Sequence, residues 1–219
     1  MTVTVDELVV ADSADAWALG GFSVDADAVC RVGGVRIRLV GRNHGAAPAA
    51  TSGSGAGIVG WSLGGLPERP LDELDGIPTT RPGAVAVAPA EHANGVTAID
   101  HVVLMSPDLN RTVESLAAVG MEPRRERDGD LGGRPIRQIF FRFGEVIIEA
   151  VGSPETTSDG PSTLWGITYV VADIDATAAF FGELTTPVKD AVQPGRRITT
   201  LRHRKLGMSV PTALISARR

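Results

Sequence analysis

A twelve-residue segment occurs twice in this chain, and the repetition limits the folds that the sequence can adopt. The first copy runs from Cys30 to Gly41 (CRVGGVRIRLVG) and the second from Phe141 to Gly152 (FRFGEVIIEAVG). Identical residues stand at equivalent places, namely Arg31, Gly33, Val35, Ile37, Val40 and Gly41 in the first copy and Arg142, Gly144, Val146, Ile148, Val151 and Gly152 in the second. Such an internal repeat indicates a chain built from copies of one small structural unit.

The same order of patterns precedes each copy: an apolar strand, an aspartate, an alanine-rich helix and a glycine. In the N-terminal copy we expect a strand at Val3–Val10, because the segment is β-branched and aliphatic. Asp12 and Ser13 are good N-caps for a helix at Ala14–Leu19. A hairpin that turns at Gly33-Gly34 then completes the unit.

The middle copy shows the unit most clearly. Strands are predicted at Val96–Met105 and Glu145–Val151, with a helix at about Asn110–Val119 between them. A third copy follows, with strands expected at Leu164–Val171 and Ser209–Ser216. The predicted fold class is therefore α+β, with tandem βαβββ modules that form curved mixed β-sheets and carry their helices on the outside.

The copies also suggest a division of the chain. Residues 1–66 are expected to form a degenerate N-terminal βαβββ-like module, and residues 96–219 a paired domain of two modules. Residues 67–95 are rich in proline and poor in strand or helix patterns. We therefore expect them to form a connecting segment over the surface.

Composition excludes several classes of function. The chain has 219 residues, a formal net charge of −5 and no basic block, which argues against a nucleic-acid partner. No stretch is long and apolar enough for a membrane helix, and the acidic N-terminus lacks a signal-peptide pattern. Cys30 is the only cysteine, which fits a reducing compartment, so a cytoplasmic location is expected.

Three segments resemble the vicinal oxygen chelate superfamily, which includes glyoxalases, bleomycin-resistance proteins and extradiol dioxygenases. They are Ala98–Leu104 with its Asp-His pair, Ser106–Leu109 before a helix, and the late strand Glu145–Val151. Trp165–Asp175 repeats the first part of this layout. The resemblance implies two modules that join into one curved sheet around a small-molecule site, often in a homodimer.

The resemblance also implies a site for one divalent metal ion such as Zn, Ni, Mn or Fe. Each module of the superfamily typically offers one ligand from its first strand and one from its last. Carried over to this sequence, these positions are His101 and Glu149 in the middle copy. Imidazole and carboxylate suit such ions, and an open coordination position makes the metal a Lewis acid.

The other copies depart from that pattern. In the third copy Gly166 aligns with His101, and Ser216 or a neighbour falls near the position of Glu149. In the N-terminal copy the equivalents are about Glu7 and Arg38. Catalytic metals usually have about three protein ligands, so a metal-free site is the alternative.

Further polar and aromatic residues are weaker candidates, each weighed against an ordinary structural role. Gln138 and Arg142 alternate along one strand and would be able to orient an anionic substrate, although solvated side chains are the commoner case. One of Arg196, Arg197 and His203 can reach the site, or all three can form an exposed edge. Aromatic residues can line a cavity or pack in the core, as for Trp61, Trp165 and Tyr169.

Two functional hypotheses follow from the resemblance. In the first, the protein is a metal-dependent lyase, isomerase or dioxygenase that acts on a small oxygenated metabolite. His101 and Glu149 then hold the metal, and Glu149 or a bound water moves a proton next to a carbonyl. In the second, the protein binds or sequesters a small molecule without a metal, as bleomycin-resistance relatives do.

Overall fold

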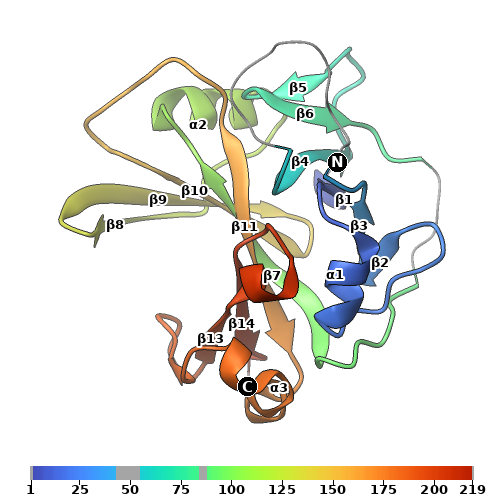
Figure 1. The fold of residues 1–219 in the computed structure, drawn as a ribbon. Coiled ribbons are helices and arrows are strands. Elements are labelled where there is room, and N and C mark those ends of the chain that lie inside the picture. Colours follow the sequence, from blue (N-terminus) through green and yellow to red (C-terminus); the bar gives the residue numbers. More distant parts are fainter. Residues whose placement is uncertain (1, 43–54, 84–87, 219) are drawn as a thin grey trace.

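The computed structural model describes residues 2–42, 55–83 and 88–218, which fold into two β-sheets with three α-helices in these ranges. Figure 1 shows a six-stranded sheet from the N-terminal part on the right and an eight-stranded sheet from the remainder. The predicted α+β class with curved mixed sheets is confirmed.

The middle copy forms one half of the large sheet, in the spatial order β7-β10-β9-β8. Its elements are β7 (Val96–Met105), α2 (Leu109–Ala117), β8 (Arg125–Leu131), β9 (Arg134–Phe143) and β10 (Val146–Gly152). The side chain of Asp108 caps α2 by accepting a hydrogen bond from the backbone N–H of Arg111 at 3.1 Å. The order of a βαβββ module is thus complete here.

The third copy forms the other half, in the order β11-β14-β13-β12. Its elements are β11 (Thr163–Val171), α3 (Ile174–Phe181), the 3₁₀ helix η1 (Gly182–Leu184), β12 (Lys189–Asp190), β13 (Arg197–Leu201), the 3₁₀ helix η2 (His203–Leu206) and β14 (Thr212–Ser216). Strands β7 and β11 run antiparallel and join the two halves, with Ile167 paired to Val102. This seam relates the two modules by an approximate twofold axis.

The N-terminal copy lies in the smaller sheet, whose order is β2-β3-β1-β4-β6-β5. Its elements are β1 (Thr4–Val10), α1 (Ala14–Leu19), β2 (Val29–Val32), β3 (Val35–Leu39), β4 (Ile58–Gly64), β5 (Glu73–Leu74) and β6 (Ile77–Thr80). Ser13 caps α1, as predicted, through a 3.3 Å bond from the N–H of Ala16. Asp12 is fully buried and instead accepts from the Trp17 indole at 3.1 Å.

Strands β5 and β6 correct one expectation, because they lie inside the segment that was predicted to be only a connection. They are short, and Pro78 interrupts the β pattern, so the sequence signal is weak. Strand β6 nevertheless pairs in parallel with β4. The proposed domain boundaries at 66 and 95 remain a prediction, although strand pairing with β4 continues to Thr80.

Register reveals that β4 and β6 are a shortened fourth copy. Gly166 of β11 lies beside Pro211, and Gly60 of β4 lies beside Pro78 in the same way. In both pairs the next residue of the later strand is a threonine, whose hydroxyl donates to a carbonyl two residues back: Thr212 to Val210 at 2.9 Å and Thr79 to Ile77 at 2.8 Å. The chain therefore holds two related pairs of modules.

The two sheets share one hydrophobic core. Leu8 and Trp61 from the smaller sheet are buried with Val102 and Ile167 from the larger one. The rings of Trp61 and Phe143 stack with centroids 5.9 Å apart. This core fixes the back of the large sheet and leaves its opposite face to carry polar groups.

None of the helices in the described ranges is long and apolar enough to cross a membrane.

Candidate functional site

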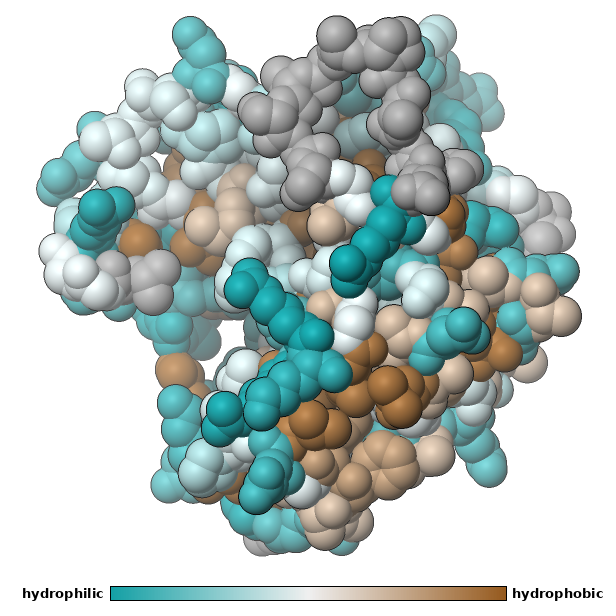
Figure 2. Space-filling view, in the orientation of Figure 1, coloured by the Kyte–Doolittle hydropathy of each residue, from teal (hydrophilic) through white to brown (hydrophobic). Residues whose placement is uncertain are grey.

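Strand register places His101 and Glu149 on the same face of the large sheet. His101 of β7 pairs with Ile147 of β10, and Glu149 pairs with Val103. Residues two apart on a strand share a face, and so do directly paired residues. This face is called the cup face below. In Figure 2 the surface is hollowed between the lobe that contains β8 and β9 and the lobe that contains β13 and β14.

The two side chains approach each other closely. The Nε2 atom of His101 lies 3.4 Å from Oε2 of Glu149, and its Nδ1 atom lies 2.9 Å from Oδ2 of Asp100. Glu149 is 8% exposed, so its carboxylate is held in a largely dry environment. The imidazole therefore stands between two carboxylates, with one ring nitrogen directed at each.

Asp100 is in turn anchored by a buried arginine. The Arg196 guanidinium, 3% exposed, donates to Oδ1 of Asp100 at 2.5 Å and to the backbone oxygen of Ser216 at 2.7 Å. Burial by itself raises the pKa of Asp100, but the hydrogen bonds from His101 and Arg196 outweigh it and lower the pKa to about 2. Asp100 is therefore an anion at neutral pH.

On the other side, Glu149 is held by Gln138 and Arg127. The amide nitrogen of Gln138 donates to Oε1 of Glu149, and the amide oxygen accepts from Nε of Arg127 at 2.8 Å. These contacts continue the polar chain from β10 to β9 and β8. Gln138 thus contacts the His101–Glu149 pair, although the sequence favoured a solvated side chain at this position.

The chain resembles a number of solved structures, including the following three. A mutant of 4-hydroxymandelate synthase from Streptomyces coelicolor matches with a TM-score of 0.61 and 16% identity, over 100% of this chain and 94% of that one. Methylmalonyl-CoA epimerase from Mycobacterium tuberculosis matches with a TM-score of 0.44 and 18% identity, over 58% of this chain and 92% of that one. A methylmalonyl-CoA epimerase from Streptomyces coelicolor gives 0.43 and 24%, over 57% and 99%.

The synthase match covers both sheets. The chain has the vicinal oxygen chelate fold. No family model and no curated protein sequence matches it. The architecture implied by the resemblance is thereby established, and its chemistry must be argued from the residues of this chain.

In the second module of this vicinal oxygen chelate sheet, the residues equivalent to His101 and Glu149 have no side chain that can bind a metal ion. Gly166 is the equivalent of His101, as predicted, because both flank the Val102–Ile167 pair at the seam. Parallel pairing of Ile167 with Thr212 makes Ala213, and not Ser216, the equivalent of Glu149. The alignment on Ser216 was wrong because it lacked the register between β11 and β14.

Packing also closes the Gly166 position to larger side chains. A Cβ atom placed on Gly166 would lie 2.8 Å from the backbone oxygen of Pro211, closer than real Cβ contacts. A histidine at this position would therefore require the neighbouring strand to move. The absence of a metal-binding side chain at position 166 therefore follows from the close approach of the backbone as well as from the residue type.

The N-terminal copy uses its equivalent positions for an ion pair. Arg38 of β3 donates to both carboxylate oxygens of Glu7, at 2.9 and 3.0 Å, and the Nε atom of Arg36 lies 3.1 Å from Glu7. The hydrogen bonds to Glu7 raise the pKa of Arg38 above its ordinary value. Glu7 and Arg38 thus satisfy each other.

A metal ion fits this donor set only in part. Among residues 2–42, 55–83 and 88–218, no group of three or more histidine, cysteine, aspartate or glutamate side chains is positioned to hold one. His101 and Glu149 are two suitable ligands, and Asp100 is occupied by Arg196 and by the far side of the imidazole. The chain therefore falls short of the three protein ligands common in catalytic sites.

The remaining candidates separate into core, surface and site. Trp61 and Tyr169 are buried in the core, whereas Trp165, 54% exposed, stands in a bulge of β11 between the paired residues Leu164 and Gly166. Arg197 is an exposed partner of Asp175. His203 lies in η2, which packs against α1. Of that group only Arg196 reaches the site.

Proposed function

We propose that the protein moves a proton next to the carbonyl group of a small oxygenated metabolite, as a lyase or isomerase, with His101 and Glu149 as its acid–base pair. The observation that carries this proposal is the position of the His101 ring. Its Nδ1 atom faces Asp100 at 2.9 Å, and its Nε2 atom faces Glu149 at 3.4 Å. A general base needs an oriented nitrogen within reach of the proton that it removes.

Asp100 supports the role of His101. Because the Asp100 carboxylate is an anion, it can accept an Nδ1–H from His101, and the base form of the ring then has its lone pair on Nε2. When Nε2 takes a proton from carbon, the same carboxylate stabilises the imidazolium. Arg196 fixes Asp100 for both states through its 2.5 Å hydrogen bond.

Glu149 provides the second group for proton transfer. It is oriented by the Gln138 amide, which is itself fixed by Arg127. A proton removed from one position by one member of the pair is returned at the same or a neighbouring carbon by the other. The product is then an isomer. In the lyase case the second member instead gives its proton to the leaving group as the bond between that group and carbon breaks, so that an alkene and the protonated leaving group form.

Metal binding by the same pair is a second proposal. The 3.4 Å distance between Nε2 of His101 and Oε2 of Glu149 is close to that expected for two ligands about 2.1 Å from one ion. A bound Zn, Ni, Mn or Fe ion would supply Lewis-acid polarisation of the substrate carbonyl. No proton-transfer step above depends on it, and a dioxygenase would need the more complete ligand set of an iron site.

The rival function is sequestration of a small molecule without chemistry, as in bleomycin-resistance proteins. It is supported by Gly166 and Ala213, which leave half of the cup face without acid–base groups. In this case the His101–Glu149 pair would only orient the ligand. The two functions differ in whether hydrogen on the bound molecule exchanges with solvent.

Deuterium incorporation tests the choice. Pyruvate and phenylpyruvate, as carbonyl probes, are incubated in D₂O with the protein, and loss of the C3 proton signal is followed by NMR. We expect exchange above the protein-free rate, with a loss of about 100-fold in His101→Ala and Glu149→Gln. Binding of a probe without any acceleration would favour sequestration.

Elemental analysis of chelator-free protein tests the metal proposal separately. Near-stoichiometric metal that is lost in His101→Ala and retained in Arg38→Ala would support it, since Arg38 pairs with Glu7 in the other sheet. Equal metal content in wild type and His101→Ala would overturn it.

Compartment and assembly are also proposals. A cytoplasmic location is supported by the single cysteine, Cys30, which is buried and whose burial raises its pKa to about 12, so that it behaves as a small apolar residue. Homodimer formation is proposed by analogy with the fold and is tested by sedimentation.

A further inference from the structure

Charge alternates along β8 with the period of a strand. The sequence from Arg125 to Asp130 reads RERDGD, so basic and acidic residues fall on opposite faces. Arg125 pairs with Phe140, and Arg127 pairs with Gln138, whose side chain bonds Glu149. The basic residues of β8 therefore lie on the cup face.

The acidic residues of β8 lie on the back of the sheet. Glu126, Arg137 and Ile139 line a cavity of about 360 Å³ together with residues of α2, which covers the back. Asp128 accepts from Arg137 at 2.7 Å on that side. Strand pairing and the cavity thus agree on which face each charge occupies.

A third arginine joins the cup face from β9. Arg142 pairs with Ile147, which pairs with His101, so the three residues form one row across the strands. In the next row Val103, Glu149, Phe140 and Arg125 are paired in turn. The third row runs from Met105 through Val151 and Gln138 to Arg127. Each of the three rows thus ends in an arginine.

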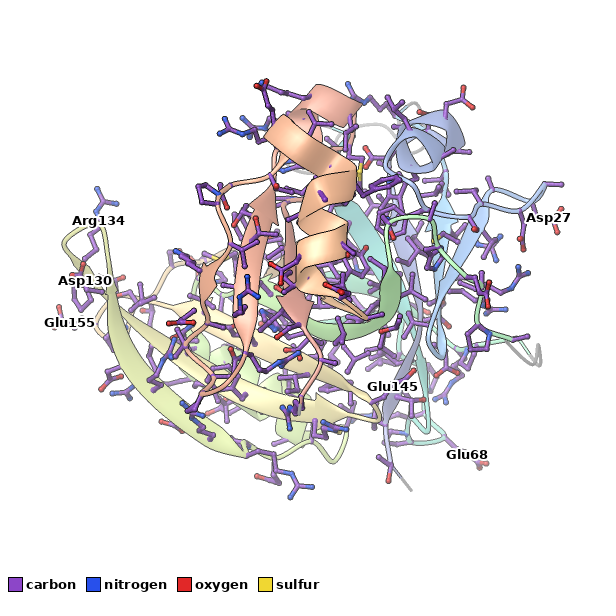
Figure 3. All side chains as sticks on the ribbon, turned by 90° about the horizontal axis from the view of Figure 1, so that it is seen from below. Asp27, Glu68, Asp130, Arg134, Glu145 and Glu155 are labelled. Atoms are coloured by element: carbon purple, nitrogen blue, oxygen red, sulfur yellow. The ribbon has the colours of Figure 1, made fainter. Side chains whose placement is uncertain are left out.

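These arginines are open to a ligand. Arg125 and Arg142 are exposed, and Arg127 is half-buried. The Arg125 guanidinium lies 5.6 Å above the centre of the Phe140 ring, and half-buried Phe140 and Ile147 separate Arg125 and Arg142 from the His101–Glu149 pair. Arg127 reaches Glu149 through the Gln138 amide. Figure 3 shows how β8 and β9 curve away from the seam to the hairpin tip marked by Asp130 and Arg134.

We propose that the substrate of this site is an anion: a carboxylate or phosphate group binds Arg125, Arg127 and Arg142, and an apolar body lies on Phe140 and Ile147. This inference rests on the proposed function, because it uses the same cup face. Strands lie about 4.8 Å apart, so the backbone of Arg142 is about 10 Å from that of His101. The anionic group is thus separated from the reacting carbon by the apolar body. Guanidinium groups favour such oxyanions through paired N–H donors.

Binding of small aromatic probes tests the proposal without any turnover. Benzoate and phenyl phosphate are titrated into the full chain by NMR, with neutral benzamide as the matched probe. We expect saturable binding of at least one anion and at least tenfold weaker binding of benzamide. Whichever anion binds more tightly identifies carboxylate or phosphate as the group recognised.

Matched arginine variants locate the binding. Arg125→Met and Arg142→Met are expected to weaken anion binding about tenfold each, whereas Arg137→Met, on the back of the same hairpin, leaves it unchanged. Equal affinity for benzoate and benzamide, or an equal loss in Arg137→Met, would overturn the proposal.

Glu149→Gln separates this inference from the proposed function. It should retain anion binding even where deuterium exchange is lost. Loss of deuterium exchange with intact anion binding in this variant supports the anion site. If the wild-type protein exchanges a neutral carbonyl compound as fast as pyruvate, the anion site is overturned, but the proposed proton transfer is not.

Discussion

Arg196 and Asp100 lie 96 positions apart in the chain, yet the guanidinium of one lies 2.5 Å from the carboxylate of the other, across the seam between the two modules of the large sheet. Both side chains are at least nine-tenths buried. The second module thus contributes to the site of the first by orienting the carboxylate that holds His101. The second module thus takes part in the candidate site although it has no metal-binding side chain at the equivalent positions.

Arg196→Met leaves the Asp100 carboxylate buried with only His101 as a partner. Removing one member of a buried ion pair typically costs about 3 kcal/mol or more, because the other charge stays desolvated. We expect a loss of this size in urea denaturation, together with reduced exchange activity. Arg197→Met is the matched control, since Arg197 is an exposed residue paired with Asp175, and should unfold like the wild type.

Asp100 also makes stability depend on acid pH. Its folded pKa, about 2, lies below the ordinary value of 3.8. A lowered pKa means that its contribution, of about 2 kcal/mol, is fully present above pH 3.8 and is lost as pH falls towards 2. The difference in unfolding free energy between wild type and Asp100→Asn should therefore shrink over this range. A constant difference would contradict the assignment.

His92 gives a second pH dependence, at higher pH. Its Nδ1 atom accepts from the N–H of Ser23 at 3.0 Å, and its Nε2 atom donates to the carbonyl of Arg31 at 3.0 Å, which requires the neutral ring. Burial lowers the pKa of His92 below 6.5. The bonds therefore stabilise the fold fully above pH 6.5 and progressively less as pH falls below it. Thermal unfolding between pH 7.5 and 5 should be less pH-dependent in His92→Ala.

Gly166→Ala tests the closed position in the second module. Its Cβ would lie 2.8 Å from the Pro211 oxygen, so we expect a loss of about 1–3 kcal/mol, as in other overpacked sites. Gly83→Ala is the control, because no atom of the residues that the structure describes would lie within 4 Å of its Cβ. Denaturant midpoints of the two variants give the comparison. Equal midpoints would show that Pro211 and β14 can move away from the added Cβ atom without loss of stability.

The fold and half of the candidate site are predictable from the sequence, for different reasons. The repeat and the alternation along its strands indicate the fold, whereas the resemblance to the vicinal oxygen chelate superfamily points to His101 on the first strand and Glu149 on the last strand of the middle copy. Asp100 and Arg196 are not predictable in this way, since no local pattern joins residues on different modules. The sequence places Ser216 or a neighbour at the position of Glu149, whereas the strand register gives Ala213, because helix caps fix the first strand of a module but not the register of its last.

The fourth copy shows a similar limit. Strands β5 and β6 are too short to leave a periodic signal, and Pro78 speaks against a central strand. Only their pairing with β4 reveals that Gly60 and Pro78 repeat the arrangement of Gly166 and Pro211. Short elements depend on their neighbours for stability, and the sequence of such a segment alone carries little of that information.

The glycine–proline contacts have a consequence for evolution and for engineering. In each pair of modules, one first strand carries an ionisable side chain and the other a glycine next to a proline carbonyl. A Cβ atom added to that glycine would lie 2.8 Å from the proline oxygen in one pair and 3.0 Å in the other. A single substitution would therefore not give the second module the metal-binding side chain that its first strand lacks. A histidine at position 166 would have to follow a change at Pro211 that lets β14 withdraw, so a designer who wants a complete metal centre here should remodel that strand first.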